Sequence, residues 1–113
     1  HLPWIVGEGW AKRMILCGER IGAEQAQSIG LVEEVVAQGE SLNRALMLAE
    51  QSEKQSPSSV SACKNLIMAA RTQSMPEALA DEKTAFVDLF STADQKEGVN
   101  AFLEKRAPSW KNA

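Results

Sequence analysis

Residues 92–106 read TADQKEGVNAFLEKR, the clearest helical pattern in the chain. Thr92 with Gln95 three positions later is a capping pattern, in which the hydroxyl accepts a hydrogen bond from the first helical turn. Lys105 and Arg106 lie in the expected final turn, where the helix dipole favours cations. The apolar positions in between are Val99, Phe102 and Leu103. This spacing predicts an amphipathic helix.

Similar signals recur towards the N-terminus. Residues 74–77, SMPE, form a capping box of the form S-x-x-E, and Ser56-Pro57 supplies a cap and a first-turn proline to another helix. Helical periodicity also covers residues 9–17, 23–29 and 41–55. Because the connections are short, neighbouring helices are expected to pack antiparallel. The chain is therefore predicted to be mainly α-helical.

The expected helices carry apolar stripes that are predicted to form the core. Their positions are Leu42, Ala45, Leu46 and Ala49, then Val60, Cys63, Leu66, Ile67 and Ala70, then Leu79, Phe86, Leu89 and Phe90. Burying one such large side chain contributes about 1.5–3 kcal/mol. Cys17 and Cys63 lack the spacing of a disulfide framework or a zinc site, so they are predicted to be buried, reduced thiols.

One segment departs from the helical pattern. Residues 31–36, LVEEVV, are rich in β-branched side chains and are predicted to form one short strand. On a strand, the adjacent Glu33 and Glu34 point to opposite faces and cannot converge on one substrate atom. They are therefore not expected to form an acid/base pair.

Composition restricts the class of protein. The 113 residues are 44% hydrophobic and 24% charged, with a net charge of −3, which is typical of one soluble domain and unfavourable for binding nucleic acid. No run approaches the roughly 20 apolar residues of a membrane span, so a cytoplasmic location is expected. His1 is given no role. The apolar run that follows it resembles the middle of a fold, and we expect further sequence to precede it.

No catalytic constellation is visible. Every Asp and Glu is expected at a cap, in a turn or on a polar helix face, and no nucleophile motif, phosphate-binding loop or metal-ligand cluster is found. The predicted catalytic and metal-binding residues are therefore none. Taken alone, the pattern describes a helical module.

The succession of short motifs resembles the crotonase (enoyl-CoA hydratase/isomerase) family over essentially the whole chain. The matching stretches are residues 2–3, 6–7, 11–12, 14–21, 23–26, 30–32, Pro57 with Lys64, 96–98 and 101–106. The family more often has Thr where this chain has Cys17, and Arg or Lys where it has Trp4.

The resemblance implies the C-terminal helical and trimerisation region of a crotonase-like (ClpP/crotonase) α/β fold, spanning residues 1–113. The family's catalytic glutamates and oxyanion-hole amides lie upstream, in an N-terminal catalytic core that is absent from this sequence. The implied parent is an enzyme of fatty acid metabolism that hydrates a 2-enoyl-CoA through a stabilised enolate, and this chain alone is expected to be inactive. The implied partners are that core, further copies in a homotrimer or hexamer, and the acyl-CoA substrate, with no tightly bound cofactor besides the substrate's coenzyme A.

Three residues match family positions at the far end of the coenzyme A site. Phe86 and Phe102 match positions near the adenine, and Lys105 matches one that meets the nucleotide phosphate. Structural roles remain open for all three, because the phenylalanines also have core spacing and Lys105 is also a helix C-terminal cation. Two other functions also remain open: a non-enzymatic helical interaction module, and a family isomerase, decarboxylase or hydrolase.

Overall fold

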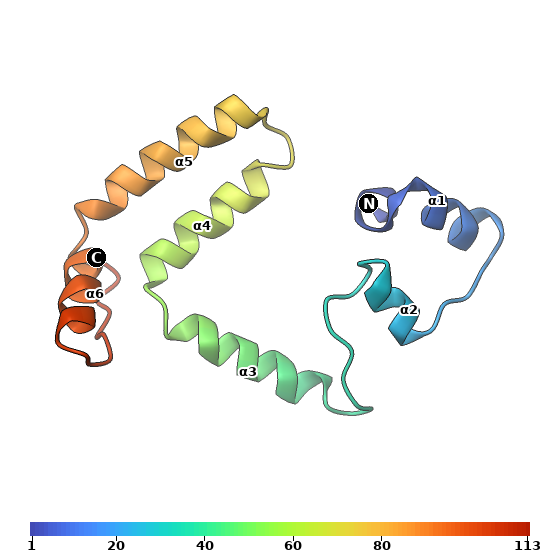
Figure 1. Cartoon of the computed structure of the whole chain (residues 1–113), viewed down its shortest axis with the longest axis horizontal. Coiled ribbons are helices and arrows are strands. Elements are labelled where there is room, and N and C mark those ends of the chain that lie inside the picture. The colour runs from blue at the N-terminus through green and yellow to red at the C-terminus, as the bar shows by residue number, and fades with distance from the viewer. The chain divides into compact units, whose positions relative to one another are not determined.

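The computed structural model describes residues 1–113 and contains six helices and no strand. The helices are α1 (Leu2–Leu16), α2 (Ala23–Ser28), α3 (Ser41–Glu53), α4 (Pro57–Ala69), α5 (Met75–Phe90) and α6 (Ala93–Leu103), as Figure 1 shows. The chain divides into two compact units, His1–Ala45 and Leu46–Ala113. The mainly helical prediction is confirmed.

In the first unit, α1 begins earlier than predicted and contains a kink. Residues before Gly7 are already helical, and Gly7 then breaks the helix with φ +81° and ψ 160°, a conformation that only glycine adopts without strain. The apolar side chains buried in this unit belong to Val6, Ala11 and Ala26. Such small groups allow only modest stabilisation by burial.

The strand predicted at residues 31–36 is wrong. No residue in this segment is in a strand, and its backbone amides at Leu31 and Val32 donate instead to Ala26 O, at 2.9 and 3.4 Å. Glu34 is held by Arg44, whose Nε lies 2.7 Å from its carboxylate. A β-branched sequence forms a strand only beside a second strand that completes its ladder, and this chain supplies none.

In the second unit, the predicted caps begin α4, α5 and α6. Ser56 Oγ and Thr92 Oγ1 each accept a hydrogen bond from a first-turn amide, at 3.5 and 3.2 Å. At α5, Glu77 accepts from the amide of Ser74 at 2.9 Å and from its hydroxyl at 2.7 Å. Helices α4 and α5 then run antiparallel, and α5 contacts α6 (Figure 1). The sequence located these three helix starts correctly.

The end of α6 differs from the prediction. The helix stops at Leu103, and Lys105 follows it with φ +53° instead of lying in its final turn. Lys105 N donates to Phe102 O at 3.2 Å and Arg106 N donates to Ala101 O at 3.0 Å. This pair of bonds is the Schellman motif, which closes a helix by satisfying its last carbonyls.

The predicted burial of the apolar stripes is not realised within this chain. Ala101 is the only buried apolar residue of the second unit, and Ile67 and Phe102 remain 69% and 82% exposed. Cys17 and Cys63 are free and exposed, so their prediction as buried thiols is wrong. The stripes stay exposed because each helix of the second unit packs against few other helices, and one neighbouring helix cannot cover a whole apolar stripe.

Candidate functional site

Phe86 lies on α5 with 61% of its surface exposed. Its ring packs edge to face against Phe90, with 4.9 Å between the ring centroids and 64° between the planes. Offset contacts of this kind are favourable for aromatic pairs and hold both rings in place. Phe86 therefore has a fixed neighbour on one side and an open face on the other.

Phe102 and Lys105 lie together at the end of α6. The hydrogen bond from Lys105 N to Phe102 O joins their backbones, and both side chains are exposed. The structure thus brings two of the three predicted ligand residues together, while Phe86 belongs to the preceding helix and contacts Phe90. Ligand contact by these three residues stays a prediction.

The charges beside Lys105 are already paired. Arg106 Nη1 and Nη2 lie 2.5 and 3.1 Å from the two oxygens of Glu97, and Arg106 Nε lies 2.6 Å from Glu104. The hydrogen bonds from Arg106 and from the Ser109 amide lower the pKa of Glu97 to about 2. Lys105 forms no ion pair, so its ammonium group is available to an anionic ligand.

Asp94, which is expected like every Asp and Glu at a cap, in a turn or on a polar helix face, lies in the first turn of α6 but is only 1% exposed, and the sequence did not single it out. Its carboxylate accepts hydrogen bonds from the amides of Lys111 and Asn112, at 2.7 and 3.1 Å, and from Ser56 Oγ at 3.1 Å. The available signal was an acidic residue in the first turn of α6, which alone indicates dipole stabilisation and not burial.

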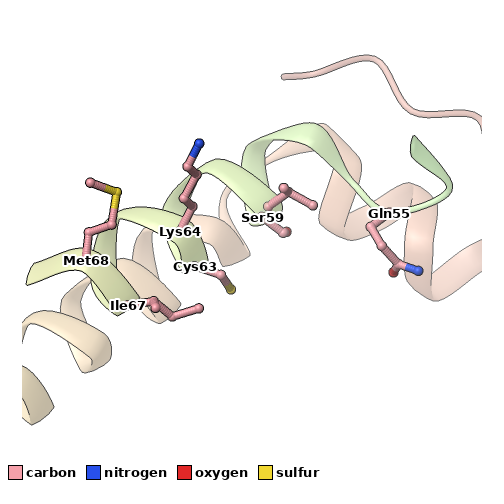
Figure 2. A pocket seen from close by; sticks show the side chains of 7 residues that line it. Gln55, Ser59, Cys63, Lys64, Ile67 and Met68 are labelled. Atoms are coloured by element: carbon pink, nitrogen blue, oxygen red, sulfur yellow. The ribbon is translucent and has the colours of Figure 1, made fainter. Parts of the chain in front are cut away.

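An open groove of about 430 Å³ lies along α4, and Figure 2 shows the side chains that line it. It is lined by Gln55, Ser59, Val60, Cys63, Lys64, Ile67 and Met68. In Figure 2, Lys64 and Met68 extend to one side of the helix while Cys63 and Ile67 extend to the other. The lining is mainly apolar and its few polar groups do not converge, so the groove offers no arrangement for catalysis.

Three further features bear on the kind of site that this chain could hold. No three His, Cys, Asp or Glu side chains are grouped so that they could hold a metal ion. None of the helices has both the length and the apolar character that crossing a membrane requires. Glu34 is paired with Arg44, and no two carboxylates face a common cavity.

Comparison with known proteins identifies the family. The sequence profile described as enoyl-CoA hydratase/isomerase matches residues 1–113. The chain is 39% identical over 106 residues to the 2,3-dehydroadipyl-CoA hydratase of Escherichia coli, covering 94% of this chain and 42% of that protein. It is also 39% identical over 106 residues to the short-chain-enoyl-CoA hydratase of Clostridium acetobutylicum, covering 94% of this chain and 41% of that protein. It therefore spans about two fifths of these relatives.

Solved structures of similar fold also match this chain. DspI of Pseudomonas aeruginosa is 55% identical with a TM-score of 0.91, covering 97% of this chain and 42% of that one. An enoyl-CoA hydratase from Bacillus anthracis is 36% identical with a TM-score of 0.92, covering 99% of this chain and 43% of that one. This chain belongs to the enoyl-CoA hydratase/isomerase (crotonase) family and corresponds to the C-terminal part of its members.

Proposed function

We propose that this chain is the assembly region and one wall of the coenzyme A site in an enzyme that hydrates a 2-enoyl-CoA. Family membership and the hydratase names of several relatives support the activity class. The chain itself contributes surface and binding groups, and the reacting atoms are handled by the remainder of the enzyme. A cytoplasmic location stays a prediction, since one relative is named as a mitochondrial protein of Dictyostelium discoideum.

The observation that carries this proposal is the exposure of the apolar helix faces. Ile67 on α4, Phe90 on α5 and Leu103 on α6 are all exposed, although their spacing is that of a core. Full burial of one such side chain would contribute about 1.5–3 kcal/mol to stability, and this contribution is missing while the side chain is exposed to water. Faces of this kind mark interaction surfaces, and the proposed occupants are the N-terminal core and further copies in a trimer or hexamer.

The proposed ligand contacts lie at the end of α6 and on α5. An exposed phenyl face such as that of Phe102 can stack on adenine, and the unpaired ammonium of Lys105 can meet a phosphate. Phe86 offers a second aromatic face. These groups would hold the nucleotide end of coenzyme A, far from the thioester that reacts.

The proposed reaction places no catalytic duty on this chain. Hydration adds the hydroxyl of water to C3 of the enoyl group, and a proton then joins C2 of the resulting thioester enolate. Backbone amides would stabilise the enolate oxygen, and carboxylates would activate the water and deliver the proton. No carboxylate of this chain is placed for that role, because each is ion-paired, hydrogen-bonded, capping or solvent-exposed and no two of them face a common cavity.

The test is an assay of the intact protein that contains this chain. A 2-enoyl-CoA should lose the ultraviolet absorbance of its conjugated thioester as 3-hydroxyacyl-CoA forms, while residues 1–113 alone should leave the absorbance unchanged. Mass spectrometry of the product distinguishes hydration from isomerisation, because only hydration adds the mass of water. An intact protein that neither binds nor converts acyl-CoA thioesters would contradict the proposal and favour a helical interaction module.

A further inference from the structure

Residues 104–113, which follow α6, contain no helix or strand, yet they are bonded to that helix along much of their length. Glu97, in the middle of α6, binds this tail twice. Its carboxylate pairs with Arg106 and also accepts a hydrogen bond from the Ser109 amide at 2.8 Å. One carboxylate therefore fixes two points of the tail that lie three residues apart.

Trp110 ties the tail to the junction between α3 and α4. Its indole N–H donates to Lys54 O at 2.9 Å, a contact between residues 56 positions apart in the sequence. Its ring lies against Gly98 of α6, where an added Cβ would come within 3.2 Å of the ring. The absence of a side chain at Gly98 thus allows the tail to pack closely on the helix.

Asp94 completes the attachment at the end of the chain. Its Oδ1 accepts from Lys111 N, while its Oδ2 accepts from Asn112 N and from the hydroxyl of Ser56, the cap of α4. Its own amide donates to Ala113 O at 2.9 Å. Figure 1 shows the C-terminus returning to the side of α6. The carboxylate is buried, and both of its oxygens accept hydrogen bonds, as a buried polar group requires.

These contacts close a loop whose turn carries Lys105. Phe102 lies on the helical side of the loop, Lys105 lies in the turn, and the bonded tail forms the return side. Arg106 is paired with Glu97 and Glu104 and so fastens the loop, whereas Lys105 in the turn forms no ion pair. A side chain on a fixed backbone loses less freedom on binding a ligand than one on a mobile segment.

We propose that Asp94, Glu97 and Trp110, here called the clasp, are positioning residues for the nucleotide end of coenzyme A. They hold residues 104–113 so that Lys105 has a fixed place beside Phe102. The inference rests on the proposed function, which assigns Phe102 and Lys105 to that end of the ligand. The clasp residues do not touch the ligand themselves, because their polar groups are occupied by the tail and by Lys54 and Ser56.

The experiment is calorimetric titration of the intact protein with butyryl-CoA and with butyryl-pantetheine, which lacks the nucleotide. Both thioesters are saturated, so binding is measured without hydration. Asp94→Asn replaces one carboxylate oxygen by an NH2 group, which cannot accept the hydrogen bond that a tail amide donates there. It should raise the Kd for butyryl-CoA about three- to tenfold, the cost of ordering one or two side chains, and leave the Kd for butyryl-pantetheine unchanged.

Two further variants separate positioning from loss of folding. Trp110→Phe keeps an aromatic ring but removes the hydrogen bond to Lys54 O. It should raise the Kd for butyryl-CoA by less than Asp94→Asn does, and leave the Kd for butyryl-pantetheine unchanged. Asp88→Asn removes the same charge as Asp94→Asn from an exposed site on α5 and should change neither Kd. A misfolded fraction lowers the binding stoichiometry and does not alter the Kd of the molecules that remain folded.

The outcomes distinguish the two proposals. Equal rises in Kd for both thioesters, or a lower stoichiometry at unchanged Kd, would overturn the clasp while leaving the proposed function intact. If the wild-type protein binds both thioesters with the same Kd, or binds neither, the assigned nucleotide site is wrong and the clasp inference is overturned with it.

Discussion

Lys105 occupies the left-handed region of backbone space, with φ +53°, directly after the last turn of α6. This conformation costs an L-residue about 1–2 kcal/mol, and glycine is its usual occupant in a Schellman motif. The backbone at this position therefore favours glycine, whereas the proposed phosphate contact requires the ammonium group. The two requirements can be separated by substitution.

Lys105→Gly should stabilise the intact protein by up to about 1 kcal/mol, because the left-handed strain is removed. The same substitution should weaken butyryl-CoA binding, because the cation is lost. The matched control is Lys96→Gly, which removes an exposed lysine from the interior of α6 and should destabilise the protein by about 1 kcal/mol. Urea unfolding measures the stability of the two variants. A loss of stability in Lys105→Gly would contradict the assigned backbone role.

Glu97 should make stability depend on pH in the acid range. Its pKa is lowered from 4.5 to about 2 in the folded protein by Arg106 and Ser109 N, so the folded state favours the ionised carboxylate. A lowered folded-state pKa contributes stability that is fully present above the unfolded value, near 4.5, and is lost as the pH falls towards 2.

The measurement for Glu97 is the difference in unfolding free energy between the wild type and Glu97→Gln, taken from pH 7 to pH 3. The difference should be constant down to about pH 5 and should shrink below that, since glutamine does not titrate. A difference that stays constant through pH 3 would show that the ion pair with Arg106 does not form in solution.

Helix caps can be predicted from the sequence, whereas the burial of a single carboxylate cannot. Ser56, Ser74 and Thr92 were identified as caps because a cap depends on residues within one helical turn. Asp94 was not identified as buried, because its main partners lie 17 and 18 positions away in a tail without regular structure. Nothing local distinguishes such a carboxylate from an exposed one.

At the scale of the element, α6 and the tail can be tested through the contact between Gly98 and Trp110. Glycine to alanine in a helix interior normally stabilises by about 1 kcal/mol. Here the new methyl group would lie 3.2 and 3.4 Å from two carbons of the Trp110 ring, so the ring would have to shift. Gly98→Ala should therefore stabilise the protein by less than this amount, or destabilise it.

A double-mutant cycle makes this prediction specific. In a Trp110→Ala background the ring is absent, and Gly98→Ala should bring its full stabilisation. The four unfolding free energies give a coupling energy between the two positions, which should be unfavourable for alanine beside tryptophan. Additive effects would show that the tail does not pack on α6.

The segment at residues 31–36 illustrates why strands are harder to predict than helices. A helix satisfies its hydrogen bonds within itself, whereas a strand depends on a neighbour that the sequence pattern does not name. The β-branched run indicates correctly that this segment is not helical, but it cannot show whether a second strand is present to pair with it. In the structure, Arg44 and the end of α2 hold this segment instead.

At the scale of the whole molecule, periodicity identified apolar faces but could not say what covers them. The stripes were expected to meet one another, yet most of their large side chains remain exposed and the buried apolar residues are few and small. The relatives that match this chain extend well beyond the matched stretch, which is about two fifths of their length, and we propose that residues outside the chain complete these faces.

Ile67→Glu tests whether the α4 face is covered in the intact protein. Ile67 is 69% exposed in this chain, so a glutamate there would be harmless if the face met only water. If the face is covered, burying an unpaired charge should lower stability by several kcal/mol or prevent assembly. Asn65→Glu, about 200° around the same helix, is the matched control and should have little effect. Thermal unfolding and gel filtration distinguish the two results.

Under the proposed function, the apolar faces of α3 to α6 are covered within a multi-subunit acyl-CoA enzyme. The most direct measurement is the molar mass of the intact protein in solution, determined by light scattering across a dilution series. We expect a mass of three or six chains that persists on dilution. A stable, folded monomer at all concentrations would contradict it.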